Sequence, residues 1–271
     1  MPRSTPSPAP SPEQLLDQAW TCLEDGRPAD ALPPLRAIAD ALPERWPAEC
    51  LAHTQLCDLV SAELALGQAA RVLDPEDAGL LWAAAELRLS QWRLHEARDA
   101  YEALARQEDD AAVLERLALL ADLEGDYQRA DELLARASVV DPQLPRPARL
   151  SDEEFERCVE AAAQALPQAF RETFETLPVV LDPMPDPSMF QGRENAETPP
   201  DLVGLFVGAD LARTEADALE LPPTIYLFQR NLERMCATRE ELIEEIRITL
   251  YHELGHALGF DESGVDSLGL T

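Results

Sequence analysis

Two histidines near the C-terminus have the spacing of a metal site. His252 and His256 lie four residues apart in the segment HELGH. On a helix this spacing places both imidazoles on one face, about one turn apart. Two ring nitrogens at about 2.0–2.1 Å can then occupy adjacent corners of a tetrahedral zinc ion without bending the helix. The pattern H-E-x-x-H therefore predicts a Zn²⁺ site on a helix.

Glu253 directly follows the first histidine and is the candidate catalytic residue. Its carboxylate cannot easily join the histidines as a ligand, but it can reach the open coordination position. Zinc lowers the pKa of a bound water from about 15.7 toward 7. A neighbouring carboxylate can therefore take up a proton at neutral pH and later give it to a leaving amine. We expect Glu253 to act as general base and general acid in peptide-bond hydrolysis.

Two histidines leave the zinc one protein ligand short, and downstream carboxylates are candidates for that ligand. Gly259 can adopt the left-handed conformation that ends a helix and turns the chain back toward the metal. In the extended pattern H-E-x-x-H-x-x-G-x-x-(H/D), the third ligand lies three residues beyond the glycine. That position is Glu262, and Asp261 and Asp266 are the alternatives.

A long helix is expected to carry the motif. Thr238 and Glu241 form a capping box, and apolar residues keep helical spacing from there to Gly259. This pattern predicts a helix of about twenty residues. A second capping box, Ser151 with Glu154, predicts the start of another helix earlier in the same half of the chain.

Short β-rich runs precede the motif helix. They lie at 178–181, 204–207 and 224–228, and we expect them to pair as a small sheet. Either the second run or residues 224–227 of the third could be an edge strand that pairs with an extended peptide. The segment 182–200 is rich in proline and polar residues, so it predicts a long loop, more often mobile than a lid.

Residues 151–271 resemble the small bacterial zincin-like metallopeptidase domain. Beyond HELGH, the segments DLVGLFVG, LPPTIYLFQRNLERMC and TREELIEEIRITLYHELGHALGFDESGVDSLG follow that family's order of strand, strand, short helix and metal-bearing helix. The resemblance implies a minimal zincin with a zinc cofactor and a peptide or protein substrate. In that family an aspartate is expected as third ligand at the position of Glu262, so this sequence departs by one methylene.

The usual downstream partner for the substrate carbonyl is missing, because no Tyr or His follows His256. Tyr226 and Arg230 are candidates to polarise that carbonyl. A tyrosine on a strand more often packs in the core or at the sheet edge. Tyr251, next to the motif, is also expected to serve packing.

The first half of the chain repeats a pattern of paired helices. The positions of Leu15, Ala19, Gly26, Ala31 and Leu35 recur after sixty-six residues and again after a further thirty-three. Small residues let two helices approach closely, and the glycine marks the turn between them. A weaker copy lies in between, with Asp58 at the turn. In that copy Glu63 and Gly67 stand at positions that are usually small and large-apolar.

This pattern resembles a tetratricopeptide array. The expected fold class is therefore an α-helical solenoid followed by a small α+β zincin-like domain. The expected segments are a disordered Pro-rich leader at 1–12, repeats at 13–145, a linker at 146–150 and the metallopeptidase domain at 151–271. Solenoid repeats form concave surfaces, so we expect the repeats to bind a protein partner.

Charge and composition exclude several classes of function. The chain has 52 acidic and 22 basic side chains, every basic one is arginine, and the net charge is -30. Binding to nucleic acid or to anionic membranes requires a cationic surface, so neither is expected. The sequence has no apolar stretch long enough to cross a membrane and no secretory leader, which predicts a cytoplasmic protein. Its five cysteines are scattered and expected to be reduced and mostly buried.

Two functions follow from these features. The first is a zinc metallopeptidase whose repeats recruit a substrate or regulator. The alternative is a non-catalytic or metal-stabilised adaptor, in which the repeats bind a partner and the zincin half does not turn over substrate. An intact H-E-x-x-H motif alone does not decide between them.

Overall fold

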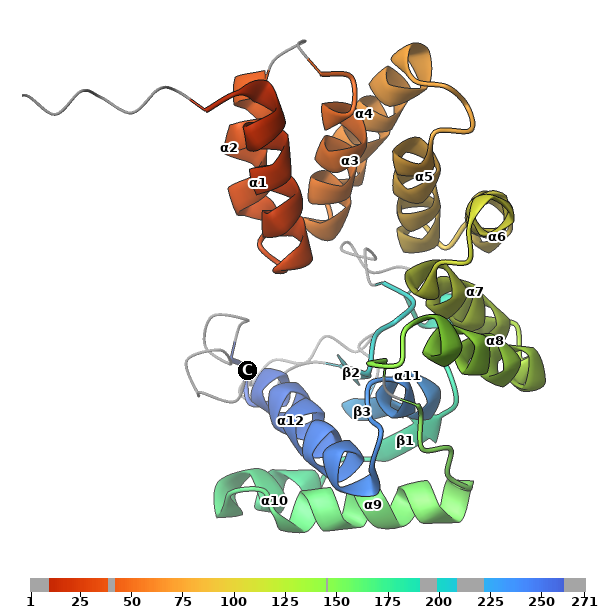
Figure 1. Cartoon of the computed structure of the whole chain (residues 1–271). Helices are drawn as coiled ribbons and strands as arrows, with labels where there is room; N and C mark the ends of the chain where they lie inside the picture. The colour runs from red at the N-terminus through yellow and green to blue at the C-terminus, as the bar shows by residue number, and fades with distance from the viewer. Residues whose placement is uncertain (1–9, 39–41, 145, 191–198, 209–221, 261–271) are drawn as a thin grey trace, which may run out of the picture. The chain divides into compact units, whose positions relative to one another are not determined.

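The computed structural model describes residues 10–38, 42–144, 146–190, 199–208 and 222–260 (Figure 1). Contacts divide the chain into two units. One consists of Met1–Leu117 with Glu194–Pro199, and the other of Ala118–Arg193 with Pro200–Thr271. The division falls inside a helix, whereas the sequence predicts a domain boundary at 146–150. That boundary stays a prediction, as does the disordered leader, of which residues 1–9 lie outside the described residues.

The described part of the first unit is helical. Its helices are α1 (Pro12–Glu24), α2 (Pro28–Ile38), α3 (Arg45–Gln55), α4 (Leu59–Val72), α5 (Ala78–Ser90) and α6 (Leu94–Gln107). The helices pack in consecutive pairs, α1 on α2, α3 on α4 and α5 on α6, and α3 also contacts α2 and α5. Buried alanines such as Ala19, Ala31 and Ala97 allow this close packing. Helix α7 (Ala111–Leu123) crosses into the second unit and is followed by α8 (Tyr127–Val140).

One turn geometry recurs in four helical pairs. Each turn has a residue of positive φ, namely Gly26 (68°), Cys57 (57°), Trp92 (58°) and Gly125 (79°). The amide of the next residue donates to a carbonyl five residues back, at 2.8–2.9 Å in all four turns. This is the Schellman arrangement that ends a helix. The recurrence supports a common hairpin unit, while the solenoid itself stays a prediction.

The predicted register of the second repeat is wrong by one residue. Its turn lies at Cys57 and not at Asp58, so Ala62 and Leu66 take the positions that the sequence alignment gave to Glu63 and Gly67. Both Ala62 and Leu66 are buried. A cysteine in the left-handed conformation gives no sequence signal for a turn, because glycine is the residue that normally adopts it.

The second unit combines helices with a small sheet. After α8 come α9 (Asp152–Gln164), α10 (Gln168–Phe174), β1 (Val179–Asp182), the 3-10 helix η1 (Pro187–Phe190), β2 (Gly204–Val207), β3 (Thr224–Phe228), α11 (Gln229–Arg234) and α12 (Arg239–Ala257). The three predicted strands are confirmed, with the first displaced by one residue. Part of the predicted loop 182–200 lies outside the described residues. No helix in the described ranges could cross a membrane.

The sheet has the order β1-β3-β2, so β3 is its central strand. β1 runs parallel to β3, and β2 runs antiparallel to it with Phe206 opposite Ile225. Helix α12 packs against β2, α9, α10 and α11. The core between them is built from fully buried side chains such as Phe155, Ile225 and Leu250. This core fixes the motif helix beside one edge strand.

The segment predicted as a linker is fastened to the second unit. Ala148 donates its amide to the Cys236 carbonyl at 3.4 Å, and Leu150 donates to the Glu233 carboxylate at 3.1 Å. The Gln229 amide group also reaches the Leu150 carbonyl at 3.0 Å. These bonds attach residues 146–150 to α11 and to Cys236, two residues after the end of that helix.

Candidate metal centre and active site

Helix α12 presents the motif as the sequence predicts. The Thr238 hydroxyl accepts from the Glu241 amide at 3.2 Å, and the Glu241 carboxylate accepts from the Thr238 amide at 3.0 Å. The helix continues to Ala257, and Gly259 beyond it has a φ of 88°. Its apolar stripe is buried, including Ile246, Leu250 and Leu254. The capping box, the helix and its glycine terminator are therefore confirmed.

The two imidazoles converge on one point. The Nε2 atoms of His252 and His256 are 3.0 Å apart, and the rings meet edge to face with centroids 4.6 Å apart. A tetrahedral zinc with bonds of about 2.0–2.1 Å holds two ligand nitrogens about 3.3 Å apart. The observed separation is close to that value. Two lone pairs at this distance repel each other unless a proton or a cation lies between them.

The second ring nitrogen of His256 sets its tautomer. Its Nδ1 lies 3.1 Å from the Phe260 carbonyl oxygen, which can only accept a hydrogen bond. The Nδ1 atom therefore carries the proton, and Nε2 is left with its lone pair toward His252. Metal-binding histidines usually donate their other N–H in this way to a carbonyl or carboxylate. The donor set thus fits zinc.

Glu253 is buried where α12 packs against β2, and a backbone amide of that strand bonds its carboxylate. Its side chain is buried, and Oε2 accepts from the Phe206 amide at 2.6 Å. A charge-assisted bond of this length fixes the orientation of the carboxylate. Sequence reasoning did not identify Phe206, because a backbone amide on another element leaves no signal in residue type.

β2 is an edge strand, and its outer side faces α12. The Phe228 amide donates to the Val203 carbonyl, so Val203 and the alternate residues after it pair with β3. The backbone groups of Gly204 and Phe206 then point away from β3. The alternative prediction, that residues 224–227 form the edge strand, is wrong, because β3 lies between the other two strands. Strand order depends on non-local pairing, which short β-rich runs do not specify.

Gly204 permits close contact between β2 and α12. A Cβ at this position would lie 2.5 Å from Cγ2 of Thr249 and 3.3 Å from Cγ of Glu253. Thr249 is itself buried in the helix. The absence of a side chain at Gly204 therefore sets the distance between the edge strand and the motif.

We expect Gly204→Ala to lower the free energy of unfolding by about 1–3 kcal/mol, because the added methyl overpacks the strand–helix contact. Thr249→Ser removes the atom that it would strike, so Gly204→Ala combined with Thr249→Ser should recover part of the loss. Urea unfolding of the two single variants and the double variant measures the coupling. Strictly additive effects would contradict this contact.

The candidates for the third ligand lie outside the described residues. Asp261, Glu262 and Asp266 all follow Phe260, the last residue that the structure describes before the C-terminus. Within the described ranges, no cluster of three or more potential metal ligands is present. The assignment of Glu262, with Asp261 and Asp266 as alternatives, therefore stays a prediction.

Residues 174–270 match the zincin-like metallopeptidase family. No curated protein matches the chain. The matched region of the zincin-like domain contains the sheet and the described part of the motif region. Helix α9 precedes it, yet α9 packs against α12 and contributes Phe155 and Cys158 to the same core. The physical unit that supports the motif therefore extends beyond the matched residues.

The two side chains considered for carbonyl polarisation differ in their surroundings. Arg230 is engaged elsewhere, because its guanidinium pairs with Asp122 and Asp131 and lies over the Tyr127 ring. This arrangement does not support a role at the substrate carbonyl. Tyr226 is partly buried on β3. Tyr251 stacks on Phe170 with ring centroids 4.1 Å apart, so its predicted packing role is confirmed.

The five cysteines all lie in the described residues and form no disulfides there, and four of them are buried while Cys57 is exposed. Burial raises the pKa of the Cys50 thiol to about 12 and that of Cys236 to about 11. Both thiols are protonated at neutral pH, and a thiol in that form is a poor nucleophile and metal ligand. The prediction that most cysteines are buried is confirmed.

Proposed function

We propose that the zincin-like domain is a zinc-dependent peptidase. The convergence of the His252 and His256 Nε2 atoms beside a buried glutamate is the observation that carries this proposal. Zinc, when bound, supplies a Lewis acid that lowers the pKa of water and polarises a carbonyl. His252, His256 and, by prediction, Glu262 would hold it. The family match over residues 174–270 supports a hydrolase of this class.

The chain's own residues account for proton transfer. The Phe206 amide holds Oε2 of Glu253 at 2.6 Å and so fixes the carboxylate that would receive a proton from the attacking water. The same carboxyl group then returns the proton to the leaving amine. Burial of Glu253 beside β2 limits competing water, and the fixed carboxylate needs little reorganisation during the reaction.

The outer edge of β2 is the proposed substrate cradle. The backbone groups of Gly204 and the carbonyl of Phe206 point away from β3 and are not used by the bond to Glu253, so an extended peptide can add there as a further strand. The substrate is therefore a peptide or protein segment in extended conformation. A strand at this edge lies against the same helix that carries Glu253.

Hydrolysis of a peptide library by the full-length protein tests this function. Cleavage should stop when a chelator removes metal and return when zinc is added. Persistent cleavage without metal would contradict a zinc mechanism. Failure of zinc-loaded protein to cleave any peptide or protein substrate would contradict the peptidase itself.

The third ligand gives a separate prediction. Glu262→Ala should weaken zinc binding far more than Asp266→Ala, because the extended motif places position 262 at the metal. Competition with a chromophoric chelator measures both affinities. The reverse order would show that the predicted ligand register is wrong.

The helical hairpins favour a second candidate function, an adaptor. Val60 and Leu64 lie one turn apart on α4, Leu56 caps the end of α3 just before the turn, and all three are exposed. Exposed apolar side chains at this spacing suit binding of a partner protein. Stable capture of one partner, without cleavage of that partner or any peptide, would favour the adaptor. We place either function in the cytoplasm, as the sequence predicts.

A further inference from the structure

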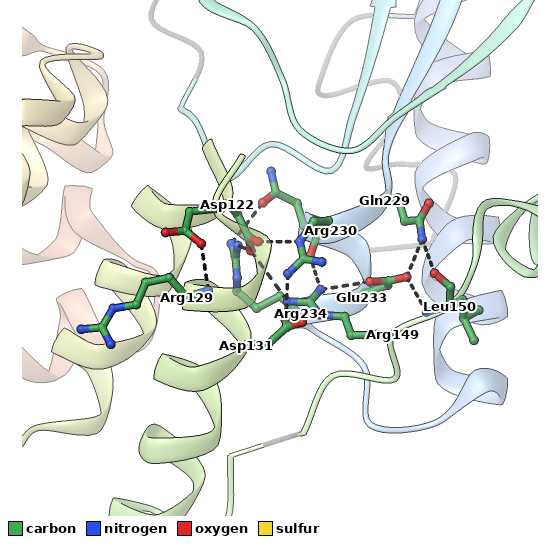
Figure 2. Close-up of polar contacts among 11 residues, drawn as sticks. Asp122, Arg129, Asp131, Arg149, Leu150, Gln229, Arg230, Glu233 and Arg234 are labelled. Carbon is green, nitrogen blue, oxygen red and sulfur yellow. Dashed lines mark hydrogen bonds and ion pairs between the residues drawn. The ribbon is translucent and has the colours of Figure 1, made fainter. Parts of the chain in front are cut away.

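A cluster of ionic groups, built around the buried carboxylates of Asp122 and Glu233, lies at the end of α7 in the second unit (Figure 2). Asp122 is 1% exposed and receives Arg230 at Oδ1 and Arg234 at Oδ2, the latter at 2.6 Å. Arg149 bonds Asp131 at 2.9 Å and the buried Glu233 at 3.0 Å. Three guanidinium groups thus face three carboxylates.

The position of Asp122 makes these partners necessary. A carboxylate in the last turn of a helix meets the negative end of the helix dipole, and burial removes its water. Arg230 and Arg234 are four residues apart on α11, so both reach the same carboxylate. Burial lowers the pKa of Arg234, and the charge of Asp122 opposes that shift. Asp122 and Arg234 therefore fix each other.

Arg234 in turn fixes Asn231. Its Nη1 donates to Asn231 Oδ1 at 3.0 Å, which commits the amide oxygen of that side chain. The Asn231 Nδ2 group then donates to the carbonyls of Pro200 at 3.0 Å and Leu202 at 2.7 Å. Asn231 is 2% exposed, so these bonds do not compete with bulk water. Asn231 thus holds the backbone of residues 200–202, which lead into β2, and we call this pair of bonds the clamp.

The clamped chain leads directly to the proposed general base. Leu202 lies two residues before Gly204, the first residue of β2. The Phe206 amide in that strand donates to Glu253 Oε2 at 2.6 Å. Thr249 packs so close to Gly204 that even a Cβ there would lie 2.5 Å from Cγ2 of Thr249, which leaves little room for β2 to slide along α12. A shift of the clamp is therefore passed on to the Glu253 carboxylate.

We propose that Asp122 is a positioning residue for Glu253, acting through Arg234, Asn231 and β2. The proposal rests on the proposed peptidase function. Asp122 touches neither substrate nor metal ligand; it determines where the strand holds the carboxylate. The end of α7 thereby belongs to the working peptidase, although the family match begins at residue 174.

The test replaces Asp122 by asparagine in the full-length protein, with Asp131→Asn as matched control. Both variants remove one negative charge from the same cluster, but Asp131 contacts Arg149 and Arg230 and lies off the route through Arg234. Asp122→Asn should lower kcat by roughly 10- to 100-fold, as small misplacements of reacting groups do. Zinc content should stay unchanged. Asp131→Asn should retain kcat.

A second measurement does not depend on activity. Hydrogen exchange at the Phe206 amide reports the bond to Glu253 in the zinc-free and zinc-loaded protein. Asp122→Asn should speed this exchange at least tenfold, while the amides of β3 stay protected. Unchanged exchange and unchanged kcat would overturn the proposal. Equal effects of Asp131→Asn would also overturn it, since the cluster would then act only through general stability.

Asn231→Asp covers the case in which Asp122→Asn does not fold. This variant keeps an acceptor for Arg234 and loses both donors to the Pro200 and Leu202 carbonyls. It should speed Phe206 exchange in the same way, and normal exchange would overturn the relay. If the wild-type protein cleaves nothing but Phe206 exchange responds as expected, the peptidase function fails while the structural relay stands.

Discussion

Glu253→Gln is expected to lower kcat for peptide hydrolysis by about 10²- to 10⁴-fold while zinc stays bound. General acid–base catalysis contributes on that scale. Glutamine has nearly the same shape and can still accept from the Phe206 amide through its side-chain oxygen. The side-chain amide of glutamine cannot take up a proton at neutral pH, so the proton-transfer step assigned to the carboxylate is lost. Steady-state kinetics on a cleaved peptide, with metal analysis of the same sample, measures both quantities.

The matched control for this variant is Glu240→Gln. Glu240 is exposed in the first turn of the same helix. Its substitution therefore removes the same charge at a site distant from the motif. It should retain wild-type hydrolysis. Full activity of Glu253→Gln, with verified zinc content, would rule out the role of this residue as general base.

His252→Ala is expected to weaken zinc binding by more than about 100-fold. Changes in the residues that merely orient a ligand already cost 10- to 100-fold, and this variant removes the ligand itself. The remaining His256 nitrogen has no second imidazole within the HELGH motif to share the ion. Calorimetric titration with zinc measures the affinity of the full-length protein.

His252→Ala should also abolish the stabilisation of the folded protein by zinc. Zinc that binds only the folded protein raises the melting temperature by mass action. This rise should be present in wild type and absent in His252→Ala. His95→Ala is the control, because His95 is exposed on α6 in the first unit. Zinc affinity equal to wild type in His252→Ala would contradict the proposed ligand set.

Local signals in the sequence predicted most of the second unit. Capping boxes at Ser151 and Thr238 mark helix starts that the structure confirms, since each depends on residues three apart. The strand 204–207 agrees in both bounds. The motif spacing also predicted the convergence of His252 and His256. Each of these features is decided within one or two helical turns, or within one short strand.

Features that depend on distant residues could not be predicted in the same way. The choice of β2 as edge strand follows from its pairing with β3, and the Phe206 bond to Glu253 follows from that pairing. The buried role of Asp122 was also missed. The sequence did contain a signal for it, because Asp122 lies one turn after the buried Ala118, in an otherwise apolar stripe of α7. The two arginines that hydrogen-bond that carboxylate, Arg230 and Arg234, lie more than a hundred residues further along the chain.

Zinc K-edge X-ray absorption of the zinc-loaded full-length protein tests the central claim most directly, because it reports the atoms bound to the metal. The proposed site predicts two imidazole nitrogens at about 2.0–2.1 Å with oxygen in the remaining positions. A first shell of oxygen alone, or thiolate sulfur at about 2.3 Å, would contradict a site built on His252 and His256.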